Sequence, residues 1–350
     1  MCEVDSFDLA EKKRFLRAER YHLQSISREV LPQFRVKSCL RYINGDNVGV
    51  HQHTESRRVF YSGLQICGSV WTCPVCAAKI SERRRKELQQ AFSVHKNAGG
   101  YISMLTLTFS HKKTDKLNEI LKRFSKAITY LFGGRAFNNI RDEMDLIGRI
   151  RVLEVTWSEK NGFHPHVHIA LFYNLKIDMS DMKKRLYVLW KKACEKVNLQ
   201  ASKSHGLDLQ GAEEAEKYLS KHGTWSLDQE LTKAHIKKGK VESLTPFDIL
   251  RKYAETEDEK YAKLFVEYAT YFKNKMQLHW SRGLKKYFHI GEKNDEELAK
   301  EKIEEADFLG LLDRSDWKII LSKNVRAQFL NDCETGGFEY AVQKHLKNSN

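Results

Sequence analysis

Residues 150–172 have the sequence IRVLEVTWSEKNGFHPHVHIALF, and this stretch decides the fold. The runs IRVLEVTW (150–157) and HPHVHIALF (164–172) are rich in β-branched and aromatic residues, which favour strands. The segment Ser-Glu-Lys-Asn-Gly (158–162), which joins them, is typical of a tight turn. The stretch therefore predicts two antiparallel strands joined as a β-hairpin.

The second strand of this hairpin carries three histidines on one face. Side chains alternate along a strand, so His164, His166 and His168 share a face, while Val167, Ile169 and Leu171 point into the core. Neutral imidazoles at i and i+2 can bind a divalent cation, and Glu154 on the partner strand can complete a two-His, one-carboxylate set. The alternative is a histidine-rich surface strand that binds nothing.

The segments around the hairpin complete an α+β pattern. A strand, YISMLTLTF (101–109), and a helix that begins at Thr114 and ends at Gly133-Gly134 precede it. A helix from about Ser180 to Val197, a short strand near Gly206 to Gln210 and another helix follow. The order β-α-β-β-α-β predicts a ferredoxin-like (split βαβ) antiparallel sheet, with helices on one face and the other face free for a site.

The helix after the last strand carries a possible nucleophile. Glu214, Tyr218 and Lys221 lie at i, i+4 and i+7, so one helix face presents a carboxylate, a phenol and an ammonium group. A phenol with a pKa near ~10 can act as a covalent nucleophile when a metal or a cation assists it. Glu213 and Glu216 are alternatives to Glu214, which alone stands one turn from Tyr218 on the same face. Without the histidines, this pattern would be an ordinary solvated face.

A cysteine cluster near the N-terminus predicts a structural metal site. The motif Cys73-Pro-Val-Cys76 places two thiols at the spacing that binds one tetrahedral zinc ion, and Cys67 lies close by. The fourth ligand could be Cys39, His51 or His53, and we favour Cys39 because thiolates are the more frequent partners in such sets. The alternative is a reduced, buried cysteine cluster. The remaining cysteines have no such company, and we expect them to be structural (Cys2, Cys194 and Cys333).

The chain is basic, with 60 Lys and Arg against 46 Asp and Glu and a net charge of +14. This balance favours a polyanionic partner, and nucleic acid is the leading candidate. The abundance of aromatic residues excludes a disordered tail protein. No apolar run is long enough to cross a bilayer, and the acidic N-terminus does not resemble a signal peptide, so we expect a cytoplasmic protein. A helix with a cationic face, residues 79–88, makes DNA contact by Arg83, Arg84 and Arg85 plausible.

Together these motifs resemble the HUH endonucleases, and within them the rolling-circle replication initiator (Rep) proteins of small bacterial plasmids that use one tyrosine and one glutamate. The resemblance covers about residues 39 to 286 and rests on five motifs. They are Met104-Leu-Thr-Leu-Thr-Phe109, His164-Pro-His-Val-His168, Glu214-x-x-x-Tyr218-x-x-Lys221, Cys67-Gly-Ser-Val-Trp-Thr-Cys-Pro-Val-Cys76 and Gln277-Leu-His-Trp-Ser-Arg-Gly-Leu284.

The resemblance implies a DNA-nicking reaction. Tyr218 would attack a phosphodiester in single-stranded or cruciform origin DNA, forming a 5′-phosphotyrosine bond and a free 3′-OH that primes synthesis. His166, His168 and Glu154 would hold Mn²⁺ or Mg²⁺ at the scissile phosphate. Glu214 would activate water for a second cleavage, and Lys221 would steady the phenolate or phosphate. His164 would position DNA or donate a hydrogen bond that supports a metal ligand.

The resemblance also implies partners and a division of the chain. Zn²⁺ would be held by Cys39, Cys67, Cys73 and Cys76, and a host helicase and DNA polymerase would act with the protein in the bacterial cytoplasm. We expect a zinc- and DNA-binding module (1–98), an HUH nuclease domain (99–225), a helical extension (226–290), and an acidic linker with a small C-terminal segment (291–350).

Two other functions remain open. A relaxase or single-tyrosine transposase of the same superfamily would share the nicking chemistry but not the role in replication. A non-catalytic, zinc-dependent DNA-binding regulator would use the cysteine module and the basic helix without cleaving DNA.

Overall fold

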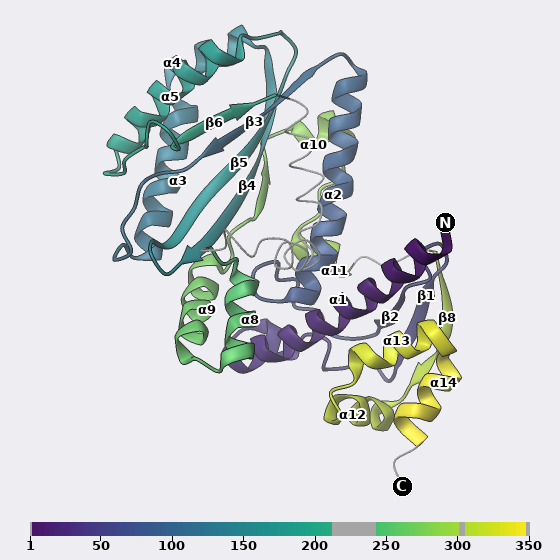
Figure 1. Cartoon of the computed structure of the whole chain (residues 1–350). Coiled ribbons are helices and arrows are strands. Elements are labelled where there is room, and N and C mark those ends of the chain that lie inside the picture. The colour runs from purple at the N-terminus through teal and green to yellow at the C-terminus, as the bar shows by residue number, and fades with distance from the viewer. Residues whose placement is uncertain (1, 212–242, 301–304, 348–350) are drawn as a thin grey trace. The chain divides into compact units, whose positions relative to one another are not determined.

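The computed structural model describes residues 2–211, 243–300 and 305–347 (Figure 1). The chain divides into two compact units, one formed by Met1–Ile80 with Asn294–Asn350 and the other by Ser81–Lys293. We call them the first and the second unit. The four segments expected from the sequence remain a prediction.

The second unit is built on a five-stranded antiparallel sheet with the strand order β6-β3-β5-β4-β7. Its strands are β3 (Tyr101–Leu107), β4 (Leu146–Ser158), β5 (Gly162–Tyr173), β6 (Leu207–Gln210) and β7 (Leu278–Trp280). Its helices are α3 (Leu117–Gly133), α4 (Arg135–Glu143), α5 (Met179–Glu195), α8 (Pro246–Thr256), α9 (Glu259–Phe272) and α10 (Leu284–Tyr287), together with most of α2 (Pro74–Asn97).

The predicted order of elements is present in this unit. The hairpin is β4 and β5, and β5 lies between β3 and β4 in the sheet. The structure adds α4 after α3, and it adds the edge strand β7 from a later part of the chain. The α+β class with antiparallel sheets is confirmed, while the assignment to the ferredoxin-like group stays a prediction from the sequence.

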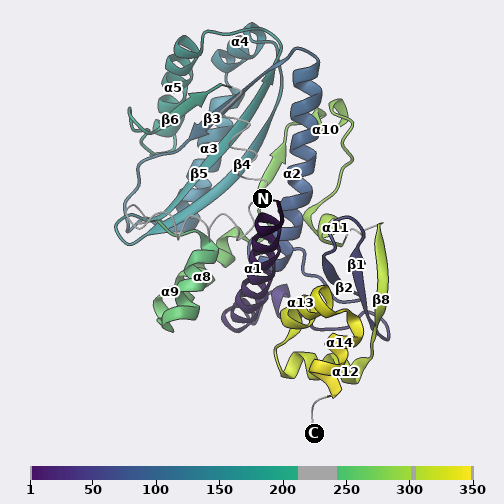
Figure 2. The same ribbon diagram turned by 45° about the vertical axis from the view of Figure 1, so that its right-hand side comes forward.

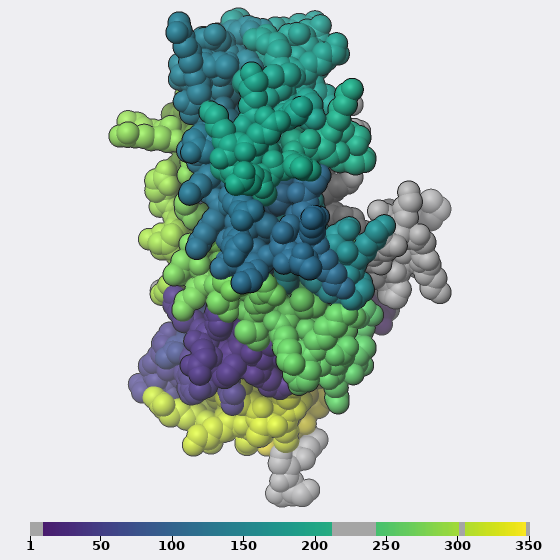
Figure 3. Space-filling model, turned by 90° about the vertical axis from the view of Figure 1, so that its left-hand side faces the viewer, coloured from purple at the N-terminus to yellow at the C-terminus, as the bar shows by residue number. Residues whose placement is uncertain are grey.

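Helices α3 and α5 cover one face of the sheet (Figure 1). The apolar residues of α3 recur every three or four positions, which puts them on one side of the helix. That side is buried, and so are the β5 residues predicted to face the core (Val167, Ile169 and Leu171). On the side seen in Figure 3, the blue-to-teal segments of this layer and the green helices α8 and α9 form the surface of the unit.

The opposite face of the sheet differs from the expectation that it is free. Phe92 of α2 and Phe288, which follows α10, pack against Phe172 of β5, with ring centroids 5.3 Å and 5.1 Å from it. Leu88 and Phe92 form part of an apolar stripe on α2. This stripe is buried against the sheet and is therefore removed from water. The covered part of this face is at the Phe172 end of β5, and the histidines lie at the other end.

The first unit contains a three-stranded antiparallel sheet with the order β2-β1-β8. Helices α12–α14 lie on one side of it (Figure 2). Its strands are β1 (Val48–His53), β2 (Val59–Ser62) and β8 (Ala306–Leu312). Its helices are α1 (Cys2–Val30), η1 (Arg35–Ser38), α11 (Asp295–Lys300), α12 (Arg314–Ser322), α13 (Arg326–Gly336), α14 (Phe338–Val342) and η2 (Gln343–Lys347).

The chain returns to the first unit at Asn294, within the acidic stretch 292–307. Among its described residues, 295–300 form α11, in which Leu298 and Ala299 are buried, and 306–307 begin β8, which pairs with β1. No helix among the residues described is long and apolar enough to span a membrane.

Candidate functional site

The pairing of β4 and β5 brings one carboxylate and two imidazoles together. Glu154 lies directly opposite His166 in the ladder, and Val152 lies opposite His168. The Oε2 atom of Glu154 is 3.0 Å from Nε2 of His166 and 3.7 Å from Nε2 of His168. One ligand atom from each of the three lies within 4.8 Å of the others, so a single cation can reach all three.

The orientation of the two imidazoles suits metal binding. The Nδ1 atom of His168 is 2.9 Å from Oγ1 of Thr106 on β3, and Nδ1 of His166 is 3.3 Å from the carbonyl oxygen of His164. These contacts occupy the ring nitrogens that face away from Glu154 and leave both Nε2 atoms directed toward it. Metal-binding histidines usually have their second nitrogen held in this way. The three side chains therefore fit a divalent cation with open positions for oxygen ligands.

Burial and neighbouring charge shift the pKa values of two of the histidines in opposite directions. Burial disfavours the charged form of His166, but the hydrogen bond and the charge of Glu154 outweigh it, so the pKa of His166 is raised. Burial lowers the pKa of His164 to about 4, and the neighbouring imidazoles of His166 and His111 add to the effect. His164 is thus neutral at physiological pH.

His164 has its own partners and does not join the group of three. Its Nε2 atom is 2.7 Å from Oγ1 of Thr108, and its Nδ1 atom is 2.7 Å from Nε2 of His111, whose ring stacks on it at 4.9 Å. Sequence reasoning missed His111, Thr106 and Thr108. Thr106 and Thr108 alternate along the 101–109 run, and this alternation was the available signal for two side chains on the histidine face.

The predicted nucleophile helix cannot be placed. Tyr218, Glu214 and Lys221, and the alternatives Glu213 and Glu216, lie outside the described residues. The last described element before them is β6, which pairs with β3 so that Asp208 lies opposite Thr106. Their roles remain predictions.

The four cysteines of the N-terminal cluster come together in the first unit. Cys39 follows η1, Cys67 lies in a loop, and Cys73 and Cys76 stand at the start of α2. The sulfur of Cys76 is 3.5 Å from that of Cys39 and 3.6 Å from that of Cys67, and the sulfurs of Cys73 and Cys39 are 3.8 Å apart. All four are buried, and their number and spacing fit a tetrahedral metal site.

The structure separates the other proposed zinc ligands from this cluster. His51 places Nε2 2.8 Å from Oγ of Ser62, and Nδ1 of His53 accepts a hydrogen bond from the backbone N–H of Ser56. Cys194 and Cys333 are buried elsewhere, and burial raises the pKa of each thiol to about 12. Neither belongs to a group of possible metal ligands among the residues described. Cys2 lies in α1, and its side chain is outside the description.

The sequence matches the family described as "Replication protein" over residues 61–325, which is more than half of the chain. The chain belongs to this family. The resemblance seen in the sequence is confirmed at the level of the family, since the match includes the His motif and three of the four clustered cysteines.

Individual relatives support the same family. A curated "Protein rep" from Streptomyces lividans is 26% identical over 241 residues, covering 54% of this chain and 53% of the relative. A "Protein rep" from Lentilactobacillus hilgardii is 28% identical over 143 residues, covering 39% and 41%. A "Neomycin resistance protein" from Streptomyces cyanogenus is 31% identical over 130 residues, covering 30% of each chain. The chain thus spans about half, or less, of the length of these relatives, and no similar solved structure was found.

In this member of the Replication protein family, the excess positive charge belongs to the second unit. That unit carries 40 of the 60 Lys and Arg residues and 26 of the 46 Asp and Glu residues, a net charge of +14, and the first unit is neutral. Of the three arginines predicted to contact DNA, Arg84 bonds to Glu87 and to the carbonyl of Lys293, and Arg85 pairs with Glu82. Arg83 lies on the same helix, α2.

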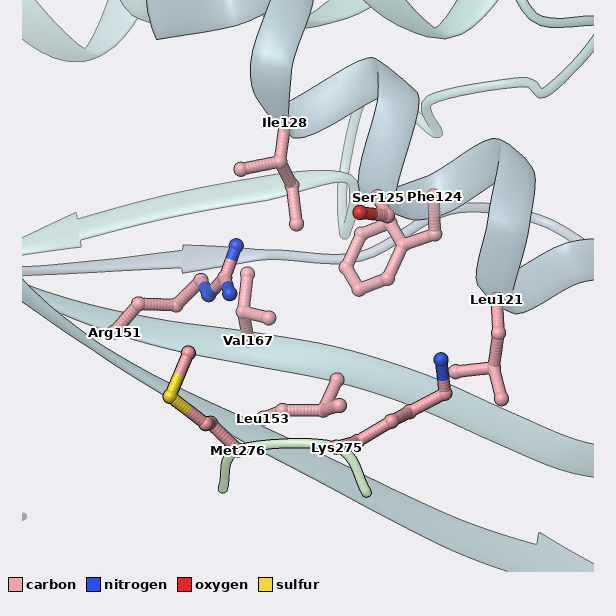
Figure 4. A pocket seen from close by; sticks show the side chains of 9 residues that line it. All are labelled: Leu121, Phe124, Ser125, Ile128, Arg151, Leu153, Val167, Lys275 and Met276. Atoms are coloured by element: carbon pink, nitrogen blue, oxygen red, sulfur yellow. The ribbon is translucent and has the colours of Figure 1, made fainter. Parts of the chain in front are cut away.

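A cavity of about 140 Å³ lies on the α3 side of the same hairpin (Figure 4). The guanidinium of Arg151 and the hydroxyl of Ser125 point into it, between Ile128 and Val167. The lining residues are Leu121, Phe124, Ser125, Ile128, Arg151, Leu153, Val167, Lys275 and Met276. Side chains alternate along β4 and β5, so this cavity and the histidine cluster lie on opposite faces of the sheet.

Proposed function

We propose that the protein is a plasmid replication initiator that nicks single-stranded origin DNA and starts rolling-circle replication. The observation that carries the proposal is the group Glu154, His166 and His168, with both Nε2 atoms directed at one carboxylate, in a chain of the Replication protein family. Two of its relatives carry the name "Protein rep". The net charge of +14 on the second unit supports a nucleic-acid substrate.

In the proposed reaction, the phenol oxygen of Tyr218 forms a bond to phosphorus and the bond from phosphorus to the 3′ oxygen breaks. The phenol loses its proton, and the 3′ oxygen gains one and leaves as a hydroxyl that a polymerase can extend. A divalent cation, Mn²⁺ or Mg²⁺, would stabilise the negative charge that develops on the phosphate oxygens. Glu154, His166 and His168 hold and orient that cation.

The remaining predicted residues complete the cycle. Lys221 favours the phenolate form of Tyr218 by its charge, and Glu214 takes a proton from water in the second cleavage that ends replication. His164, which stays neutral and is fixed by Thr108 and His111, orients the DNA strand next to the cation. The four cysteines hold Zn²⁺ in a structural role.

A covalent-adduct assay tests this function. The protein is mixed with labelled single-stranded DNA from its own replicon and Mn²⁺, and the products are separated on a denaturing gel. We expect a detergent-stable adduct that is lost with EDTA and with Tyr218→Phe. The matched control is Tyr253→Phe in α8, which removes the same hydroxyl outside the proposed site and should leave the adduct unchanged.

The outcomes separate the competing functions. Binding of the cognate DNA without any adduct, unaffected by chelators, would contradict the nuclease and favour a DNA-binding regulator. An adduct from a protein that mobilises a plasmid carrying the cognate origin, without replicating it, would favour a relaxase or a transposase.

A further inference from the structure

Two arginines are buried beside the cysteine cluster of the first unit. Arg28 of α1 is 9% exposed and Arg326 of α13 is 2% exposed. A guanidinium group stays charged at neutral pH, so both arginines carry a positive charge inside the unit. Placing two positive charges inside a protein is costly unless negative charge compensates them.

The direct partners of these arginines are all neutral. The side-chain oxygen of Gln24 accepts hydrogen bonds from both, at 2.7 Å from Arg28 and 2.8 Å from Arg326. Arg28 also donates to the carbonyl of Cys39, and Arg326 donates to the carbonyl of Leu40 and to Oγ of Ser25. Within the described parts of the chain, neither arginine forms a salt bridge with a carboxylate.

The cysteine sulfurs lie one hydrogen bond beyond the amide that binds both arginines, and they carry negative charge when they bind a metal. The Nε2 atom of Gln24 donates a hydrogen bond to the sulfur of Cys73 at 3.2 Å, while the oxygen of the same amide accepts from both arginines. Arg28 also reaches the backbone of Cys39, another member of the cluster. One amide therefore connects both guanidinium groups to the cluster.

The charges balance for one state of this cluster. Four thiolates carry four negative charges, and a divalent ion reduces the total to two, which equals the charge of the two arginines. A trivalent ion, protonated thiols or two disulfides would leave part of the buried positive charge without compensation. We propose that Arg28 and Arg326 are the counter-charges of a tetrathiolate site for a divalent ion, and that α13 is thereby part of this metal site.

This inference gives the C-terminal region a role that the sequence does not suggest. Arg326 follows Gln24 by 302 residues, yet it contacts the same amide that binds Cys73. Retention of the ion should depend on the charge at position 326 as well as on the four cysteines. The inference does not depend on the nicking activity and is tested without it.

The first test compares charge variants of the full-length protein purified with zinc. We expect Arg326→Gln to lose zinc to a chelator about tenfold faster than the wild type, as is usual when a residue that supports metal ligands is removed. Arg326→Lys, which keeps the charge, should restore much of the difference. Arg314→Gln, at an exposed position of the same region, is the matched control and should behave as the wild type. Equal zinc loss from the Gln and Lys variants, or wild-type kinetics for Arg326→Gln, would overturn the proposal.

A second variant keeps the proposal testable if the arginine variants do not fold. Gln24→Glu has nearly the same shape and puts a carboxylate between the two guanidinium groups and the sulfur of Cys73. We expect it to stabilise the metal-free protein and to weaken zinc binding, so that the difference in melting temperature between the zinc-loaded and metal-free forms becomes smaller. An unchanged or larger difference would contradict the charge balance.

Discussion

The Oγ1 atom of Thr106 lies 2.9 Å from Nδ1 of His168 and orients that imidazole so that Nε2 faces Glu154. When Nε2 binds a metal, Nδ1 carries the proton and donates it to the threonine hydroxyl. The ring orientation that presents Nε2 to the ion is thus supported by β3, a strand that supplies none of the three ligands.

We expect Thr106→Val to lower the affinity for Mn²⁺ about tenfold, because the variant leaves Nδ1 of His168 without its partner. Titration calorimetry on the purified protein measures the effect. Thr108→Val is the matched control, since it removes the same hydroxyl two residues along the chain but affects His164. An equal loss of affinity in the two variants would show that Thr106 has no specific role.

In the metal-free protein, His164 and His166 should become protonated at clearly different pH values. The pKa of His166 is raised by Glu154, so this pair stabilises the fold fully below about pH 6.5 and the contribution is lost as the pH rises through the raised value. The pKa of His164 is lowered to about 4, so stability falls as the pH drops from about 6.5 toward that value.

An NMR titration in EDTA measures both pKa values. We expect the His164 ring to remain neutral at pH 5 and the His166 ring to be largely charged there. Glu154→Gln should lower the pKa of His166 and leave His164 nearly unchanged. Titration of His164 between pH 6 and 7 would contradict the burial that the structure gives it.

Two arginines on the α3 face should contribute to DNA affinity. Arg149 lies 4.1 Å from the centroid of the Phe132 ring and Arg151 points into the cavity, and neither forms a salt bridge within the described residues. The salt dependence of DNA binding reports how many counterions the bound phosphates release. If DNA phosphates bind these arginines, Arg149→Gln and Arg151→Gln should each lower that number by about one. Fluorescence anisotropy at several salt concentrations measures this. Arg185→Gln is the control because Glu143 and Asp181 already neutralise Arg185, and an equal effect there would exclude a specific contact.

Phe172 should be a main source of stability behind the histidine strand. It is fully buried and packs against Phe92, His95 and Phe288. We expect Phe172→Ala to lower the free energy of unfolding by about 3–5 kcal/mol, measured by urea denaturation. Leu175→Ala, at a position that is 53% exposed, should change it by less than about 0.5 kcal/mol. A small effect of Phe172→Ala would mean that the core relaxes to fill the space.

Local periodicity predicted the parts of the structure that depend on neighbouring residues. The alternation in 150–172 gave the hairpin, its buried residues and the meeting of Glu154 with His166, because strand pairing makes opposite positions contacts. The spacing of Cys73 and Cys76 likewise indicated a tight pair of thiols, and Cys39, favoured among three alternatives, is the residue that lies with them.

Local periodicity does not predict contacts between segments that are far apart in the sequence. The pattern of α2 did not show that Phe92 covers the far end of the sheet, and nothing near Arg326 pointed to Gln24. Thr106 and His111 were missed for the same reason, since each acts on a residue more than 50 positions away. The nucleophile helix remains a prediction, because its residues are outside those described.

The turn between β4 and β5 has a consequence for how the hairpin tolerates changes of length. The ladder closes with Ser158 opposite Gly162, whose φ of +75° suits glycine, and the pair Glu154 and His166 lies four residues further along on each side. Inserting or deleting one residue between Glu154 and Ser158 would turn Glu154 to the other face of the sheet. An insertion scan should therefore find residues 155–158 and 162–165 far less tolerant of altered length than of altered residue type, although none of them is proposed to bind the cation.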